Sequence, residues 1–283
     1  AVSTAGSVLG AALTGFVLIP VLPISKILLG AAALLLALGA LGSWLSTRAR
    51  PLGQLAACAA CAALCLRPAP APSMALSARE SAYGRIVVFE SGQQRFLLVN
   101  GTSQSVMDIE GGESQSQYVH AFEWALALRP HARRALVVGL GAGLLPKALE
   151  RRGLDVDAIE IDPAIAETAR ANFGYEPRGR VLIADGRASL EREAETWDMV
   201  FLDAFGAESA PTHLFTVEAF ASVRDRLSPN GVFAINLVSI VSGPGDRPWK
   251  AVYRTLSSSF PYVRAFLASE PNSGLANVLF FAS

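Results

Sequence analysis

The first quarter of the chain consists of long apolar runs separated by a few basic residues. No charged residue occurs in 1–25, in 27–47 or in 51–66. The first two runs reach the roughly 20 apolar residues that cross a bilayer core, and the third is marginal at sixteen. A signal peptide contains a single apolar stretch of about 7 to 15 residues, whereas these runs recur. The pattern predicts transmembrane helices within 1–67, two of full length and a shorter third.

A proline-rich linker, 68–76, separates these runs from a different pattern. Two segments rich in Val, Ile, Phe and Leu, 84–91 and 94–100, meet at Ser91-Gly92-Gln93, which is a short hairpin signal. We therefore predict a small antiparallel β cap over 77–115.

From residue 116 onward, predicted strands alternate with predicted helices. A helix at 117–128 precedes strands at 136–138, 156–161, 180–183, 198–202 and 232–237, with helices at 144–152, 163–171, 187–194 and about 216–227 between them. This alternation predicts an α/β fold with a mostly parallel, doubly wound, Rossmann-like sheet in a catalytic domain over 116–283. The segments 263–268 and 277–281 predict an antiparallel hairpin that closes the sheet edge.

Charge is distributed unevenly although the formal net charge is zero. Residues 1–76 carry four basic side chains and no acid, so the remaining 207 residues hold 20 basic and 24 acidic side chains. This acidic balance does not favour nucleic acid as a partner. The three cysteines, Cys58, Cys61 and Cys65, share one face of the third apolar run, and we interpret them as packing residues because no His or carboxylate lies nearby. No metal site is predicted.

The segment 135–147, ALVVGLGAGLLPK, points most directly to a ligand. Four apolar residues lead into Gly139, Gly141 and Gly143, and a helical pattern follows at once. This order predicts a buried strand, a tight turn that lets the backbone approach a ligand, and a helix N-terminus with unpaired N–H groups. Glu160 ends the next strand seventeen residues after Gly143, close to the roughly 20 expected for a carboxylate that binds ribose hydroxyls. The spacing G-x-G-x-G favours an adenosyl sulfonium cofactor over a dinucleotide.

Polar residues at the other strand ends complete the candidate site, because ligands of such sheets bind beyond the carboxyl ends of the strands. Asp185, with Gly186, is placed either to accept from the exocyclic amine of adenine or to cap a helix. Asp203 ends an apolar strand, so desolvation disfavours its ionised form and suits it to act as a base or as a counter-charge for a cationic substrate. Tyr118, on the helix before the glycine strand, is a candidate for the same pocket.

These motifs together resemble a known family. The series VVGLGAG, AIEIDP, IADGR, DMVFLDAF and PTHLFTVEAF, with the preceding hairpin and SQYVHAFEW, is similar to the spermidine synthase family of aminopropyltransferases. GSVLGAALTGFVLIP resembles helices of the membrane-fused bacterial members, in which a multi-helix apolar region precedes the catalytic domain. The resemblance covers essentially the whole chain, and several motifs are shared with S-adenosylmethionine-dependent methyltransferases.

The resemblance implies a role for each candidate residue. Glu160 is expected to hold the ribose hydroxyls, Asp185 the adenine, and Gln104 another part of the cofactor. Asp203 is expected to accept a proton from the attacking amine, with Tyr118 beside it. The cofactor is then a co-substrate, S-adenosylmethionine or its decarboxylated form, and methylthioadenosine leaves as a neutral thioether.

Three departures from the family pattern bear on the substrate. The glycine loop carries Ala142 where the family has an aspartate that binds the aminopropyl ammonium, and Ala204-Phe205-Gly206 replaces a stretch with a second aspartate. Gly84 and Val119 stand where the family usually has glutamine or histidine. Loss of acidic groups weakens a diamine site and relieves repulsion against the carboxylate of intact S-adenosylmethionine.

Three functions are consistent with these features of the sequence. The first is a membrane-anchored, spermidine synthase-like transferase. The second is an enzyme that uses intact S-adenosylmethionine, as a methyltransferase or as a lyase that forms methylthioadenosine without an acceptor. The third is a non-catalytic nucleoside sensor attached to a membrane domain.

The expected partners are a small-molecule substrate and the lipid bilayer, and a homodimer is left open. Basic residues flank the apolar runs on both sides, so the positive-inside rule supports either orientation. We expect a multi-pass inner-membrane protein with its catalytic domain in the cytoplasm, where an adenosyl sulfonium compound is made. Because the chain starts with Ala1, we also expect it to begin inside a longer or processed protein.

Overall fold

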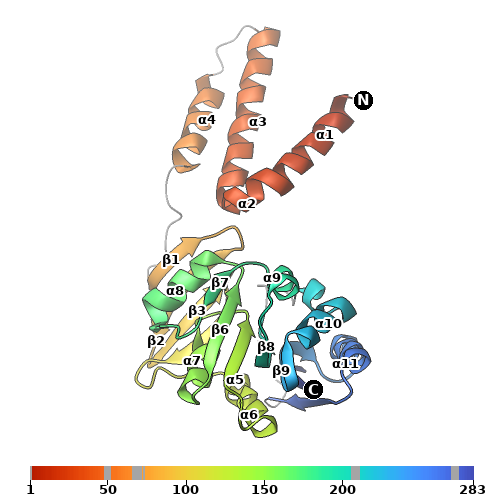
Figure 1. Cartoon of the computed structure of the whole chain (residues 1–283). Coiled ribbons are helices and arrows are strands. Elements are labelled where there is room, and N and C mark those ends of the chain that lie inside the picture. The colour runs from red at the N-terminus through yellow and green to blue at the C-terminus, as the bar shows by residue number, and fades with distance from the viewer. Residues whose placement is uncertain (1, 48–51, 66–71, 73, 205–210, 269–273) are drawn as a thin grey trace. The chain divides into compact units, whose positions relative to one another are not determined.

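The computed structural model describes residues 2–47, 52–65, 72, 74–204, 211–268 and 274–283. The chain divides into two compact units, Ala1–Ile86 and Val87–Ser283, and each is described by itself (Figure 1). Part of the predicted linker and residues 205 and 206 lie outside the described residues.

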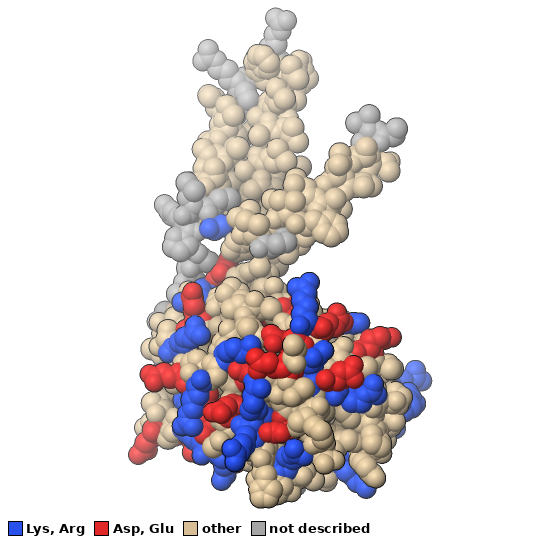
Figure 2. All heavy atoms as spheres, viewed as in Figure 1, with Lys and Arg blue, Asp and Glu red and all other residues tan. Residues whose placement is uncertain are grey.

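The first unit begins with apolar helices. They are α1 (Val2–Leu13), the π-helical turn η1 (Thr14–Leu18), α2 (Ile19–Val21), α3 (Ile24–Thr47) and α4 (Leu52–Cys65). Leu22 is extended, with φ −123°, and precedes Pro23, whose ring disfavours helical geometry in the residue before it. The first apolar run is therefore divided by a break before α3. On the face shown in Figure 2 these helices carry almost no charge, whereas acidic and basic side chains are interspersed over the second unit.

One described helix is long and apolar enough to cross a membrane by length and composition. It comprises Ile24–Ser46, with a mean hydropathy of 2.2. The apolar helices Thr4–Leu18 and Leu52–Leu64 are shorter than a full span. One described helix thus has the length and hydropathy of a membrane span, and the transmembrane helices stay a prediction.

A four-stranded sheet follows, in the order β1-β2-β3-β4. Its strands are β1 (Ala75–Glu80), β2 (Arg85–Ser91), β3 (Gln94–Val99) and β4 (Thr102–Asp108). The two predicted strands correspond to β2 and β3, and β1 and β4 extend the sheet on either side. Gly92 and Gly101 have positive φ values, 59° and 81°, in the turns that join β2 to β3 and β3 to β4.

The second sheet has seven strands in the order β10-β11-β9-β8-β5-β6-β7. It is formed by β5 (Arg134–Val138), β6 (Asp155–Glu160), β7 (Val181–Ile183), β8 (Trp197–Leu202), β9 (Leu227–Ile240), β10 (Val263–Leu267) and β11 (Leu275–Ala282). Strands β7, β6, β5, β8 and β9, which are neighbours in that order, run parallel to one another. Strand β11 runs antiparallel to both β9 and β10. The predicted parallel sheet and its antiparallel hairpin at the edge are confirmed.

Helices cover both faces of this sheet (Figure 1). Alternate residues of β5 point to opposite faces, so Leu136 and Val138 join one apolar cluster and Ala135 and Val137 join another. The first cluster includes residues of α9 (Gly186–Arg192), α10 (Val217–Asp225) and α11 (Arg247–Ser259). The second includes residues of α5 (Gln117–Phe122), α6 (Ala125–Leu128) and α7 (Leu144–Arg151). The remaining helix of this unit, α8 (Pro163–Phe173), contributes Ala166 and Ala169 to a third cluster.

Three elements differ from the sequence-based expectation. The helix predicted at 117–128 is two short helices, α5 and α6. The strand expected at 232–237 begins earlier, at Leu227, although Pro229-Asn230-Gly231 is a sequence typical of a turn, because a register shift against β8 accommodates Asn230 with its positive φ of 60°. Helix α11 was not predicted, although its buried Val252 and Leu256 stand four residues apart, the spacing of one helix face.

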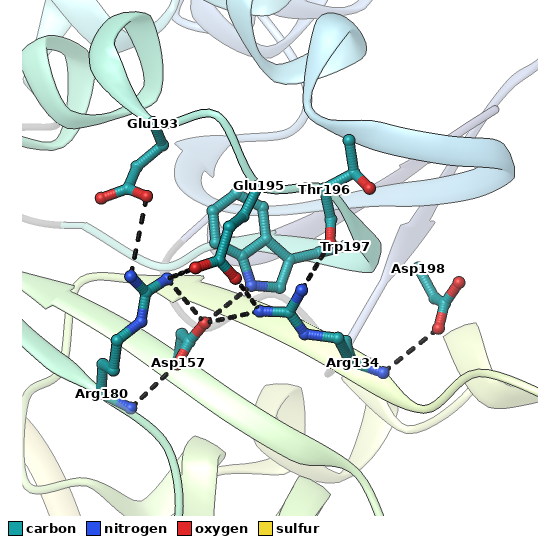
Figure 3. A network of polar contacts seen from close by, with 8 residues as sticks. All are labelled: Arg134, Asp157, Arg180, Glu193, Glu195, Thr196, Trp197 and Asp198. Atoms are coloured by element: carbon teal, nitrogen blue, oxygen red, sulfur yellow. Dashed lines mark hydrogen bonds and ion pairs between the residues drawn. The ribbon is translucent and has the colours of Figure 1, made fainter.

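A polar network around the buried Asp157 joins the strands near their amino ends, opposite the glycine turn (Figure 3). Its centre is Asp157 Oδ2, which accepts from Trp197 Nε1 at 3.0 Å, from Arg180 at 3.2 Å and from Arg134 at 3.3 Å. The other oxygen of Asp157 accepts from the backbone N–H of Arg180 at 2.8 Å. Burial opposes ionisation of Asp157, but these hydrogen bonds outweigh it and hold the pKa of the carboxyl below its usual value. The network therefore stabilises β5, β6 and β8 around an ionised Asp157.

Replacing Asp157 with asparagine should lower the free energy of unfolding by about 1–3 kcal/mol at pH 7, because a charged acceptor of buried donors is lost. The pKa of Asp157 is lowered on folding, so the stabilisation is present above the unfolded pKa of about 3.9 and disappears as pH falls through the folded value. Urea unfolding at pH 7 and near pH 3 should show the difference between wild type and Asp157→Asn shrinking in acid. Glu195→Gln, at a half-exposed partner of the same arginines, is the control and should change stability little. A constant difference at both pH values would contradict the prediction.

Candidate active site

The centre of the seven-stranded sheet is its topological switch point. The chain enters at β5, extends to β6 and β7 on one side, and then returns to β8 on the other side of β5. The ends of the two central strands are adjacent, with Val138 paired with Leu202. In doubly wound sheets this is where ligands bind, because the segments that follow the two strands diverge and leave a crevice.

The glycine turn connects β5 to α7 at this point. Gly139, Gly141 and Gly143 all have positive φ values, 97°, 54° and 74°. A Cβ on Gly139 would lie 2.4 Å from the backbone oxygen of Asp203, and one on Gly143 would lie 2.5 Å from the Tyr175 ring. Glycine is therefore required both by the backbone conformation and by close packing. The predicted order of strand, tight turn and helix start is confirmed.

Glu160 is buried at the end of β6, with 8% of its surface exposed. Its Oε2 accepts from the N–H of Leu140 in the glycine turn, and its Oε1 accepts from the N–H of Asp162, both at 2.9 Å. Burial raises the pKa of Glu160, while these hydrogen bonds act in the opposite direction. Each oxygen keeps a second lone pair, so the carboxylate can fix the turn and still accept from a ribose hydroxyl.

Gln104 lies at an irregularity of β4. Leu97 pairs with Ser105 and Leu98 pairs with Ser103, so Gln104 is the extra residue of a β-bulge. The neighbouring Ser105 Oγ accepts from the N–H of Ala142 at 3.3 Å and lies 3.0 Å from the position of a Cβ on Gly141. The bulge therefore brings the segment that carries Gln104 against the glycine turn.

Asp185 is the N-cap of α9 and accepts from the N–H of Ala188 at 2.8 Å. Its second oxygen lies 3.3 Å from His213 Nε2. Gly186 packs tightly, since a Cβ there would lie 2.7 Å from a methyl group of Val138. The capping role is observed, and adenine binding by Asp185 and Gly186 stays a prediction.

Asp203 follows β8 and accepts two hydrogen bonds from other side chains at the switch point. Its Oδ2 accepts from Tyr118 Oη at 3.1 Å, and its Oδ1 accepts from Asn236 Nδ2 at 3.0 Å. Burial raises the pKa of Asp203 to about 6, while the hydrogen bonds from Asn236 and Tyr118 act to lower it. Burial and the nearby Asp203 carboxylate raise the pKa of Tyr118 well above 10, so its hydroxyl remains a donor at neutral pH. The structure thus brings Tyr118 and Asp203 together as expected.

Asn236 and Asn277 extend this arrangement. Asn236 is 1% exposed, and its Oδ1 accepts from Asn277 Nδ2 at 2.9 Å. Asn236 stands at the end of a predicted strand, where its polarity is a visible signal. Nothing in the sequence indicates that Asn277, 41 residues later, would contact it.

The arrangement suits a nucleoside that carries a reactive, positively charged group. The glycine turn and Glu160, which accepts from the N–H of Leu140, form a polar cradle at the ends of β5 and β6, and Asp203 places a weakly acidic carboxylate beside it. Across the described ranges, no group of three or more His, Cys, Asp or Glu side chains is arranged to hold a metal ion.

The fold and sheet order define an α/β protein of the S-adenosylmethionine-dependent methyltransferase type. A model of the spermine/spermidine synthase domain matches residues 120–264. The chain belongs to the spermine/spermidine synthase family.

Relatives include both aminopropyltransferases and methyltransferases. A polyamine aminopropyltransferase of Vibrio vulnificus is 31% identical over 176 residues, which cover 57% of this chain and 58% of the relative. Polyamine aminopropyltransferase 2 of Pseudomonas aeruginosa is 30% identical and covers 63% of this chain and 53% of the relative. The human eEF1A lysine and N-terminal methyltransferase is 36% identical over 46% of this chain and 20% of the relative. The chain thus spans less than two thirds of the length of these relatives.

Solved structures give the same fold. Spermidine synthase from Thermotoga maritima has a TM-score of 0.61 and 23% identity, and the match covers 74% of this chain and 72% of that chain. Human methyltransferase-like protein 13 in complex with SAH has a TM-score of 0.50 and 28% identity, and the match covers 59% and 82% of the two chains.

Proposed function

We propose that this protein is a spermidine synthase-like enzyme that binds an S-adenosyl sulfonium donor and transfers its aminopropyl group to an amine. In the proposed reaction, the amine nitrogen attacks the carbon next to the sulfonium. The carbon–sulfur bond breaks, its electron pair returns to sulfur, and methylthioadenosine leaves as a neutral thioether. The glycine turn, Glu160, Asp185 and Gln104 bind the donor.

The observation that carries the proposal is the position of Asp203. A protonated amine cannot attack, so the reaction requires a base within reach of the acceptor nitrogen. Asp203 lies at the switch point, is held on both oxygens by neutral donors, and has a pKa of about 6. Asp203 is therefore ionised at neutral pH. It is also basic enough to take the proton that the acceptor nitrogen loses as the new carbon–nitrogen bond forms.

A second candidate function uses intact S-adenosylmethionine. The specific observation in its favour is Ala142, which is fully buried in the glycine turn at the position where the resemblance predicts an acid. Without a carboxylate there, the aminopropyl ammonium loses a partner, and the carboxylate of intact S-adenosylmethionine meets no repulsion from this position. Two outcomes are then open, namely methyl transfer to an acceptor or internal cleavage to methylthioadenosine.

Membrane anchoring belongs to the same proposal. Helix α3 is the segment best suited to span the bilayer, and further spans would come from the shorter apolar helices. We place the protein in the inner membrane, with the second unit on the cytoplasmic side, where the donor is made, and leave a homodimer open.

The test is to identify the nucleoside product. The full chain in detergent is incubated with S-adenosylmethionine or with its decarboxylated form, each with and without putrescine as a probe amine, and the products are identified by mass. Methylthioadenosine formed only from the decarboxylated donor with an amine would support aminopropyl transfer. Methylthioadenosine from the intact donor without an amine would support a lyase, and S-adenosylhomocysteine would support a methyltransferase. Binding of either donor without any product would refute both enzymatic proposals in favour of a nucleoside sensor.

A further inference from the structure

Two side-chain amides form a short chain that ends on Asp203. Asn236 lies on β9, where it pairs with Leu279, and Asn277 lies two residues earlier on the neighbouring β11. Asn277 Nδ2 donates to Asn236 Oδ1 at 2.9 Å, and Asn236 Nδ2 donates to Asp203 Oδ1 at 3.0 Å. Asn277 has no role in the site as proposed above.

The direction of these hydrogen bonds matters because an amide has two different ends. An NH2 group that faces a carboxylate stabilises the ionised form, whereas a carbonyl oxygen in the same place favours the protonated acid. Asn236 is almost completely buried, so neither end can turn to water instead. Its Oδ1 is engaged by Asn277, which leaves the NH2 group to face Asp203.

We infer that Asn277, acting through Asn236, is a positioning residue that keeps Asp203 in its ionised, proton-accepting form. The inference rests on the proposed function only in taking Asp203 as the base. Asn277 does not touch Asp203 in this arrangement. It selects which end of the Asn236 amide the carboxylate meets, and it thereby sets the pH at which Asp203 can accept a proton.

The other groups around Asp203 do not provide this control. Tyr118 from α5 donates to Oδ2 and stays protonated at neutral pH. Gly139, directly after β5, packs its backbone against the backbone of Asp203 and carries no side chain. Among the described residues that contact the carboxylate, Tyr118 is the titratable one, and it stays protonated near pH 6. A titration observed at the carboxyl near pH 6 therefore reports on Asp203 itself.

The experiment measures the pKa of Asp203 directly. The full chain in detergent carries ¹³C at the aspartate carboxyl carbons, and the Asp203 signal is assigned by its loss in Asp203→Asn. For the wild type we expect a midpoint of about 6. For Asn277→Leu we expect the midpoint to rise by about one pH unit, because a hydrogen bond from a neutral donor to a carboxylate lowers its pKa by an amount of this order. Val238→Ala, at the residue paired with Asn277 across the ladder, is the matched control and should leave the midpoint unchanged.

A second measurement needs no variant. The ¹⁵N and ¹H signals of the Asn236 side-chain amide in the wild type should shift through the same midpoint as the Asp203 carboxyl. An unchanged midpoint in Asn277→Leu, or Asn236 amide signals that do not follow Asp203, would overturn the inference.

Turnover distinguishes this inference from the proposed function. If Asp203 is the base, the acid limb of kcat/KM should move with the carboxyl midpoint in Asn277→Leu. A carboxyl midpoint that moves without the acid limb would support the positioning role and refute Asp203 as the base.

Discussion

Asp203→Asn should reduce turnover by about 10²–10⁴-fold, the usual contribution of a general base. The substitution keeps the size of the side chain and its contact with Asn236, but the amide cannot accept a proton. Donor affinity, measured by calorimetry, should change little, because the cradle of glycines and Glu160 is untouched. Wild-type turnover should fall as pH drops through about 6, since the base is ionised only above that pKa, and the residual activity of Asp203→Asn should lack this dependence.

The same variant should be more stable than the wild type at pH 7. The pKa of Asp203 is raised on folding to about 6, so its ionised form costs stability at neutral pH and costs nothing below the unfolded value near 4. Removing the charge should therefore raise the free energy of unfolding by roughly 3 kcal/mol at pH 7, and the gain should vanish in acid. Asp225→Asn, at an exposed carboxylate of α10, is the control and should alter neither turnover nor stability. A loss of less than tenfold in turnover would exclude Asp203 as the base.

Gly139→Ala should disable both the fold around the site and its chemistry. The φ of 97° is strained for any residue with a Cβ, and that atom would lie 2.4 Å from the backbone oxygen of Asp203. Relief of the overlap must separate the ends of β5 and β8, which displaces the glycine turn and Asp203 together. We expect a loss of about 3 kcal/mol in the free energy of unfolding, from backbone strain and overpacking combined. Donor binding and turnover should fall with it.

Gly153→Ala separates strain from overlap. Gly153 has nearly the same φ, 91°, but a Cβ there would meet nothing within 4 Å. It should cost about 1–2 kcal/mol from strain alone, with donor affinity and turnover retained. Urea unfolding and donor calorimetry on both variants check the prediction, and equal effects of the two substitutions would show that close packing against Asp203 is unimportant.

The local order of elements follows from short-range pattern. The apolar run of β5, its glycines and the amphipathic α7 lie within 18 residues, so backbone preference and periodicity suffice to predict them. Polar residues at the ends of parallel strands are also predictable as neighbours, because such ends meet at one edge of the sheet. This is why Glu160 and Asp203 are correctly expected at the same edge without knowledge of the sheet order.

Contacts between distant segments are less accessible to such reasoning. The β-bulge at Gln104 depends on the pairing of β3 with β4. Strand β9 is continuous because a register shift against β8 accommodates residues 229–231, whose sequence is typical of a turn. The bonds from Trp197 and Arg180 to Asp157 depend on three strands coming together. In each case, pairing between strands either overrides the conformation that the local sequence favours or brings together residues whose spacing in the sequence does not predict contact.

Local sequence is enough to predict the fold class, the glycine turn, the carboxylates at the strand ends and the family resemblance, because each is encoded within a few turns of helix or one strand. The three-dimensional packing alone shows that Asn236 donates to Asp203 and that Asn277 donates in turn to Asn236. The pKa of a carboxylate depends on burial and on the donors that surround it. The donors to Asp203 come from α5 and β9, and β11 supplies the donor to Asn236, so the residues involved lie far apart in the chain.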